Sequence, residues 1–319
     1  MESAPSGLHL RRDHVQVVFV VALLSLAHGS MGARRLMELY EPDPSELLTY
    51  HNGTVLSGDI PVSILWYGRF TAAQKDIVSD FLASLVSGVG GTYPAPSVPQ
   101  WWGSILDLYL SKVKSVGKKE AKKTRVFLSG NFSDEACSLG RSLTLSQLLA
   151  LAAAAKPAKG GVALVLTAQD VAVEGFCMSR CGMHGSDAKA GTAYVWVGNS
   201  AAQCPAQCAW PFKQEEPAVV PPNGDLGMDG LVINVASMLA GAVTDPFGYG
   251  FYQGEREAPL EAATACQGVY GKGAYPGNAG ELLIDKVTGA SYNANGAHGR
   301  KYLLPALFDP LSSQCATLV

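Results

Sequence analysis

One stretch of the chain decides its class of fold: Ile60-Pro61-Val62-Ser63-Ile64-Leu65-Trp66-Tyr67. β-Branched and aromatic residues dominate this stretch, which predicts a buried strand. Thr71 follows and is expected to cap a helix over residues 72–85, because apolar residues recur there at helical spacing.

Outward from this stretch, the alternation of strands and helices continues. We expect a helix over residues 101–116, strands over 125–128, 161–166 and 192–197, a helix over 146–155, and a long apolar helix over 226–243. Asp225 opens the long helix and Asp245-Pro246 stops it. Gly, Tyr, Asn and Pro dominate beyond it. The sequence therefore predicts a single mixed α/β domain with a loop-rich, disulfide-tied C-terminal part.

Length and composition exclude several classes of protein. The 319 residues are enough to bury a substantial core, and 48% are apolar against 16% charged, which excludes a disordered charged tail. Lys+Arg 24 against Asp+Glu 27 gives a net charge of −3, so no global charge argues for a nucleic-acid partner.

The N-terminus carries the signature of secretion. Arg11 and Arg12 precede an apolar run over residues 15–27, and small residues follow. This pattern predicts a signal peptide over residues 1–29, with cleavage possible up to Ala33. We interpret residues 30–58 as an extended lead-in and 59–319 as the domain. No later apolar stretch reaches transmembrane length without interruption, so we expect a soluble, secreted protein with no transmembrane segment in the mature chain.

The cysteines fit an oxidising compartment. Two CxxxC pairs are compatible with a tetrathiolate zinc site, but secretion favours disulfides and leaves one thiol free or in an intermolecular bond. The sequence does not fix their pairing. Asn52 and Asn131 lie in sequons and are candidates for N-glycosylation. The seven disulfide candidates are Cys137, Cys177, Cys181, Cys204, Cys208, Cys266 and Cys315.

A search for catalytic motifs finds none. His51, His184 and His298 are the histidines that remain after the signal, and no HExxH, GxSxG or P-loop motif is present. His184 and Arg180 lie in a polar cluster between residues 177 and 187, where a Cys–His nucleophile pair is one interpretation. Disulfide use explains the cysteines without chemistry. We therefore expect no catalytic residue, no metal and no cofactor, and keep Arg180 and His184 as possible binding residues.

Four carboxylates follow or end the long apolar helix: Asp245, Glu255, Glu257 and Glu261. A glycosidase would need two of them at a defined separation, which a sequence cannot supply. Salt bridges or exposed loop charges are the expected use.

A strongly basic segment interrupts the near-neutral chain, with Glu120 as its one acid. Two interpretations of this basic segment are possible. It is either a solvated helix end and loop, or an electrostatic patch that binds an acidic wall polysaccharide or a membrane surface. Its members are Lys112, Lys114, Lys118, Lys119, Lys122, Lys123 and Arg125.

In five motifs the chain resembles the plant EXORDIUM (phosphate-induced) protein family, from about residue 47 to residue 319. The motifs are Ser63-Ile64-Leu65-Trp66-Tyr67-Gly68-Arg69-Phe70, Pro99-Gln100-Trp101-Trp102, Cys177-Met178-Ser179-Arg180-Cys181-Gly182-Met183-His184-Gly185-Ser186, Ala242-Val243-Thr244-Asp245-Pro246-Phe247-Gly248 and Gly271-Lys272-Gly273-Ala274-Tyr275-Pro276-Gly277. The resemblance implies an apoplastic protein linked to cell expansion and to brassinosteroid- or carbon-responsive growth. It implies no reaction, cofactor or receptor.

The long apolar helix also resembles the zinc helix of some secreted bacterial metallopeptidases. Carried over by position, Ser237 stands at the first histidine, Met238 at the general-base glutamate and Gly241 at the next ligand. A glycine has no ligand atom, and a methionine cannot take a proton from water. The resemblance implies a zincin-like scaffold with a degenerate metal site, and the alternative is an ordinary core helix of small residues.

Together these observations predict a secreted cell-wall protein that regulates expansion and growth as a non-catalytic binder of an extracellular protein or wall polysaccharide. An extracellular hydrolase with a site near His184 is one alternative. A structural wall protein held by the odd cysteine or by the basic segment is another.

Overall fold

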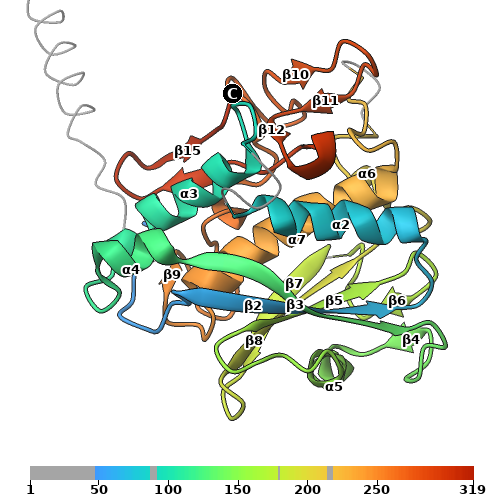
Figure 1. Cartoon of the computed structure of the whole chain (residues 1–319), viewed down its shortest axis with the longest axis horizontal. Helices are drawn as coiled ribbons and strands as arrows, with labels where there is room; N and C mark the ends of the chain where they lie inside the picture. Colours follow the sequence, from blue (N-terminus) through green and yellow to red (C-terminus); the bar gives the residue numbers. More distant parts are fainter. Residues whose placement is uncertain (1–46, 87–91, 179, 214–217) are drawn as a thin grey trace, which may run out of the picture. The chain divides into compact units, whose positions relative to one another are not determined.

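A five-stranded sheet forms the centre of the computed structural model, which describes residues 47–86, 92–178, 180–213 and 218–319 (Figure 1). Its strand order is β3-β2-β5-β8-β7, in which the first four strands are parallel and β7 runs antiparallel to β8 at one edge. The strands are β2 (Asp59–Tyr67), β3 (Arg125–Asp134), β5 (Val162–Thr167), β7 (Gly182–Asp187) and β8 (Thr192–Gly198).

Strand β2 confirms the expected role of the opening stretch. Ile60, Val62, Ile64 and Trp66 are fully buried, and β2 pairs in parallel with β3 on one side and β5 on the other. A nearly continuous apolar run is typical of a parallel strand that is covered on both faces. The expected strands at 161–166 and 192–197 are confirmed as β5 and β8, whereas β7 was not expected.

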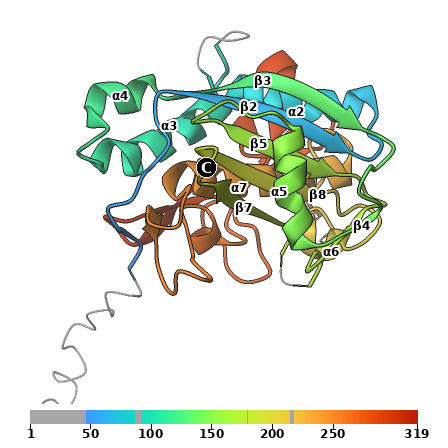
Figure 2. The same cartoon turned by 90° about the horizontal axis from the view of Figure 1, so that it is seen from below.

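Helices cover both faces of the sheet, as Figures 1 and 2 show. Helices α2 (Ala72–Ser84) and α7 (Leu226–Thr244) lie on one face, where α7 contacts β7 and β8. Helix α5 (Leu145–Ala154) lies on the opposite face against β5 and β8. The mixed α/β class is therefore confirmed, with three layers around one main core.

Helix α7 begins as expected at Asp225, whose carboxylate accepts a hydrogen bond from the Met228 amide at 3.0 Å. Within the described ranges it is the one helix long and apolar enough to cross a membrane. However, 78% of its apolar window is buried inside the structure, as in a core helix.

The helix expected over residues 101–116 is wrong in its extent. The chain forms α3 (Val98–Leu108), a 3-10 turn η2 (Leu110–Lys112) and α4 (Gly117–Lys123). Helix α3 begins early because Ser97 and Gln100 form a capping box and a proline stands in its first turn. Tyr109 and Leu110, both fully buried, anchor the break between helices.

Short paired strands and turns make up the rest, so the loop-rich C-terminal part is confirmed. Strand β1 (Thr49–Tyr50), at the end of the expected lead-in, pairs with β9 (Phe251–Tyr252) and so belongs to the folded unit. The other pairs are β4 (Ser142–Leu143) with β6 (Ala172–Val173), β10 (Leu283–Ile284) with β11 (Ser291–Tyr292), β12 (Ala294–Asn295) with β13 (Lys301–Tyr302), and β14 (Leu307–Asp309) with β15 (Gln314–Ala316). The remaining turns of helix are α6 (Pro205–Cys208), η3 (Thr264–Cys266) and η4 (Ala297–Gly299).

Three disulfides confirm the cysteine analysis. Cys177–Cys204 and Cys181–Cys208 join the loop before β7 to α6 as two adjacent staples, and Cys266–Cys315 ties the C-terminal part. These pairings use all four sulfurs of the CxxxC pairs as disulfides rather than as zinc ligands. Cys137 is the odd cysteine, and it is only 5% exposed, which argues against an intermolecular bond through it.

The two sequons differ in setting. Asn52 is exposed in a bend with a positive φ of 65°, as expected of a turn. Asn131 instead lies within β3, and its side-chain oxygen accepts a hydrogen bond from the Trp66 indole at 2.7 Å. The predicted signal peptide and residues 30–46 of the lead-in lie outside the described residues.

Candidate functional site

The three degenerate positions of α7 lie where the sequence places them, on one apolar helix. Ser237 donates its hydroxyl hydrogen to the Ile233 carbonyl at 3.0 Å, within the helix itself. Met238 packs toward the start of β7, where its Cγ would lie 3.2 Å from a Cβ added to Gly182. Neither side chain is available as a metal ligand of the zinc-helix type.

Gly241 lies beneath a buried ion pair. His184 extends from β7, and its Nε2 lies 2.8 Å from both carboxylate oxygens of Glu261, which precedes η3. A Cβ added to Gly241 would lie 2.5 Å from Glu261 Oε2 and 2.8 Å from His184 Nε2. The His184 and Glu261 side chains are only 13% and 6% exposed. The ion pair therefore fills the space above the helix that a larger residue at position 241 would need.

A second carboxylate completes this cluster. Asp245, at the end of α7, is 2% exposed and accepts a hydrogen bond from the Gly250 amide at 2.5 Å. Burial raises the pKa of Asp245, and the negative charge of Glu261 adds to the rise. Burial works against a charged His184, but the charge and hydrogen bond of Glu261, together with Asp245, outweigh it and raise the pKa of His184.

This cluster has acid–base groups but no metal ligand set. Within the described ranges, no group of three or more His, Cys, Asp or Glu side chains is arranged to hold a metal ion. His184 Nδ1 is buried without a hydrogen-bond partner there. From the sequence we expected salt bridges or exposed loop charges for the carboxylates near α7. The ion pair of Glu261 with His184 confirms a salt bridge for one of them.

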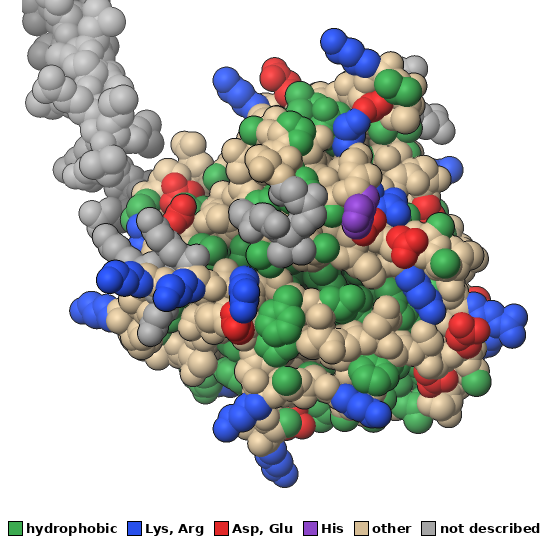
Figure 3. All heavy atoms as spheres, in the orientation of Figure 1, with side chains coloured by type: hydrophobic (Ala, Val, Ile, Leu, Met, Phe, Trp, Pro, Cys, Tyr) green, Lys and Arg blue, Asp and Glu red, His purple; other side chains and the backbone are tan. Residues whose placement is uncertain are grey.

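The other candidate binding residues lie elsewhere. Arg180 precedes β7, and its guanidinium lies 3.7 Å from the Met183 sulfur rather than on His184. The basic segment forms η2, α4 and the start of β3, and Figure 3 shows Lys and Arg side chains gathered over α4. Lys112, Lys114, Lys119 and Lys123 are exposed, while Arg125 pairs with Asp59 at 2.6 Å. Lys118 and Lys122 stand in α4 itself.

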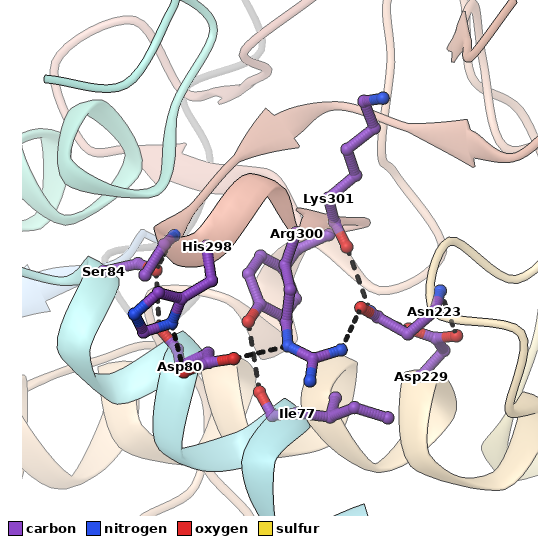
Figure 4. Close-up of polar contacts among 10 residues, drawn as sticks. Ile77, Asp80, Ser84, Asn223, Asp229, His298, Arg300 and Lys301 are labelled. Carbon is purple, nitrogen blue, oxygen red and sulfur yellow. Dashed lines mark hydrogen bonds and ion pairs between the residues drawn. The ribbon is translucent and has the colours of Figure 1, made fainter. Parts of the chain in front are cut away.

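A separate polar network joins the C-terminal part to α2 and α7 (Figure 4). Asp80 of α2 accepts from His298 Nδ1 at 2.8 Å and from Arg300 Nε at 2.5 Å. Arg300 continues to Asn223 at 3.1 Å, and Asn223 donates to the buried Asp229 of α7 at 2.6 Å. His298, which the sequence treated as a surface residue without a role, therefore belongs to a structural clamp. No local signal reveals it, because its partners lie about 220 residues apart.

Asp229 is the most strongly perturbed carboxyl of this clamp. Burial raises its pKa to about 7, against the opposing effect of the hydrogen bonds from Asn223. The clamp therefore contains a group that changes charge near neutrality.

Fold and site together define a disulfide-stapled α/β protein in which a buried His184–Glu261 ion pair lies above the long apolar helix α7. The model of the family described as "Phosphate-induced protein 1 conserved region" matches residues 48–318. Protein PHOSPHATE-INDUCED 1 of Nicotiana tabacum is 49% identical over 93% of this chain and 96% of its own length. Protein EXORDIUM of Arabidopsis thaliana is also 49% identical, with the same coverage. EXORDIUM-like 1 of the same plant is 49% identical over 84% of this chain and 89% of its own.

The chain belongs to this EXORDIUM, or phosphate-induced, family, as its motifs predict. No solved structure matches it.

Gly241→Ala should destabilise the protein by about 2 kcal/mol. Alanine favours a helix by ~1 kcal/mol over glycine, but its Cβ would displace the buried His184–Glu261 pair, whose disruption costs ~3 kcal/mol. Urea unfolding with the disulfides intact measures the difference.

Gly103→Ala is the matched control, because a Cβ at this position of α3 meets nothing within 4 Å. It should gain ~0.5–1 kcal/mol. If Gly241→Ala were as stable as Gly103→Ala, the ion pair would not occupy the space above Gly241.

Unfolding free energy should fall as the pH rises from 5 to 8. The pKa of Asp229 is raised to about 7, so the native state holds a proton that the unfolded state releases near pH 4, and stability decreases across that window. The raised pKa of His184 acts in the same direction, because its contribution is lost as the pH rises through the folded value. Asp229→Asn should reduce the decline by ~2 kcal/mol, while Asp107→Asn on the exposed side of α3 leaves it unchanged. An equal decline in both variants would exclude Asp229 as its source.

Proposed function

We propose that this chain is secreted into the plant extracellular space and regulates cell expansion there as a non-catalytic binding protein. Membership of the EXORDIUM family supports a plant, growth-related role. Three disulfides are compatible with an oxidising compartment. The partner that we propose is an extracellular protein or a wall polysaccharide.

The proposed absence of catalysis rests on one observation, the ion pair above Gly241. If α7 descends from a zinc helix, its second ligand position is a glycine, and the space of the missing imidazole is filled by His184 and Glu261. Ser237 is engaged with its own helix, so the first ligand position also holds no metal donor. We therefore interpret the domain as a zincin-like scaffold whose metal site has been replaced by a structural contact.

A hydrolase is the second candidate, and one observation favours it. His184 pairs with a carboxylate at Nε2 and has an unpartnered, buried Nδ1 within the described part of the chain. A carboxylate-oriented imidazole is the arrangement of a general base. No serine or cysteine among its described hydrogen-bond partners completes such a site.

The experiment uses protein secreted by plant cells that express the full chain. We expect recovery from the medium with an N-terminus between Ser30 and Arg34, far less than one zinc ion per chain, and no turnover of wall glycans or peptides. Stoichiometric zinc would contradict the degenerate site, and retention inside the cells would contradict secretion.

Matched histidine variants separate the two candidates. Turnover that is abolished by His184→Ala and kept by His298→Ala would establish the hydrolase. Both variants should retain the three disulfides and a cooperative thermal transition, so that loss of folding is not mistaken for loss of activity.

A further inference from the structure

A cavity of about 540 Å³ opens between α3, the end of α2 and the starts of β2 and β3. Its accessible wall is apolar where the partly exposed Val86, Pro99 and Leu106 line it, while Leu85 and Trp102 behind them are each only 2% exposed. Its size lies within the range of about 300–1,000 Å³ typical of small-molecule sites, which combine an apolar wall with a few placed polar groups. It lies apart from the cluster around Gly241 and shares no residue with it.

The polar groups of this cavity carry a net positive charge. Asp59, Lys123 and Arg125 line it together. Arg125 holds Asp59 through two hydrogen bonds, at 2.6 and 3.1 Å, which fixes both side chains. Lys123 is exposed and has no ion pair within the described residues. Two cations against one carboxylate leave one positive charge for a ligand.

The surroundings reinforce this charge. Lys114 and Lys119 are exposed on the loop after η2 and on α4, the helix that also supplies Lys123, whereas Lys112 of η2 lies near the carboxylate of Asp309. A surface rich in one sign of charge attracts ligands of the opposite sign and raises their local concentration. The apolar wall and the cationic groups together match a ligand that is apolar at one end and anionic at the other.

We propose that this cavity binds a small amphipathic carboxylate, with its ring or short acyl chain against Val86, Pro99 and Leu106 and its carboxylate at Lys123. The sequence allowed two interpretations of the basic segment, a solvated loop or a patch for a polysaccharide or membrane. In this proposal the segment instead supplies the charge of a small-molecule site. The proposal does not depend on secretion or on the absence of catalysis at α7.

Gly103 offers a direct test, because it lines the cavity and a Cβ added there meets nothing within 4 Å. Gly103→Leu therefore fills the cavity from a helical position without a backbone clash. Ala153→Leu places the same side chain at an exposed position of α5, on the opposite face of the sheet, and leaves the cavity open. Equal thermal transitions of the two variants and the wild type control for folding.

The probes are 8-anilinonaphthalene-1-sulfonate, followed by fluorescence, and decanoate as a competitor. We expect a saturable site on the wild type and on Ala153→Leu, displacement by decanoate, and an affinity at least ~10-fold weaker in Gly103→Leu. Lys123→Gln should weaken decanoate binding, and decanol should compete less well than decanoate. Absence of a saturable site, undiminished affinity in Gly103→Leu or equal competition by decanol would overturn the proposal. None of these results would bear on secretion or on zinc content.

Discussion

The ion pair between His184 and Glu261 is the contact on which the centre of this structure depends. It joins the edge strand β7 to the segment before η3, and it lies directly above Gly241 of α7. Removing either partner would leave a buried charge without compensation, which is far more costly than losing a surface salt bridge. A glycine in the last turn of α7 weakens the helix, but it is the residue that leaves room for this pair.

Other contacts hold the same elements at their ends. The Cys181–Cys208 disulfide fixes the residue that immediately precedes β7. Near the start of α7, Asp229 joins the network that runs through Asn223 and Arg300 to Asp80. At its end, Asp245 binds the Gly250 amide. Helix α7 is therefore held near its start and again around its last turn, which suits a scaffold better than a moving part.

Sequence reasoning succeeded where one local signal dominated. The apolar run of β2, the capping of α2 by Thr71 and the Asp225 start of α7 each follow from neighbouring residues. It failed at β7, because Gly182-Met183-His184-Gly185-Ser186-Asp187 has little β-propensity and becomes a strand by pairing with β8. It also failed at the break around Tyr109, since burial against distant residues, not propensity, decides it.

The residues of the candidate site could be predicted from the sequence, but their contacts could not, because these contacts join residues that are distant in the sequence. The resemblance to a zinc helix singled out Ser237, Met238 and Gly241, and the polar cluster over residues 177–187 singled out His184. The contact between Gly241, His184 and Glu261 joins residues up to 77 positions apart and appears only in the fold. The structural role of Gly241 therefore depends on whether His184 and Glu261 form a coupled, buried contact.

A double-mutant cycle measures that coupling directly. The unfolding free energies of the wild type, His184→Ala, Glu261→Ala and the double variant would be determined at pH 5.5, where His184 is charged. Each single change should cost ~3 kcal/mol, and the double change should cost at least ~2 kcal/mol less than their sum. Additivity within ~0.5 kcal/mol would show that the two side chains do not interact and would contradict the account.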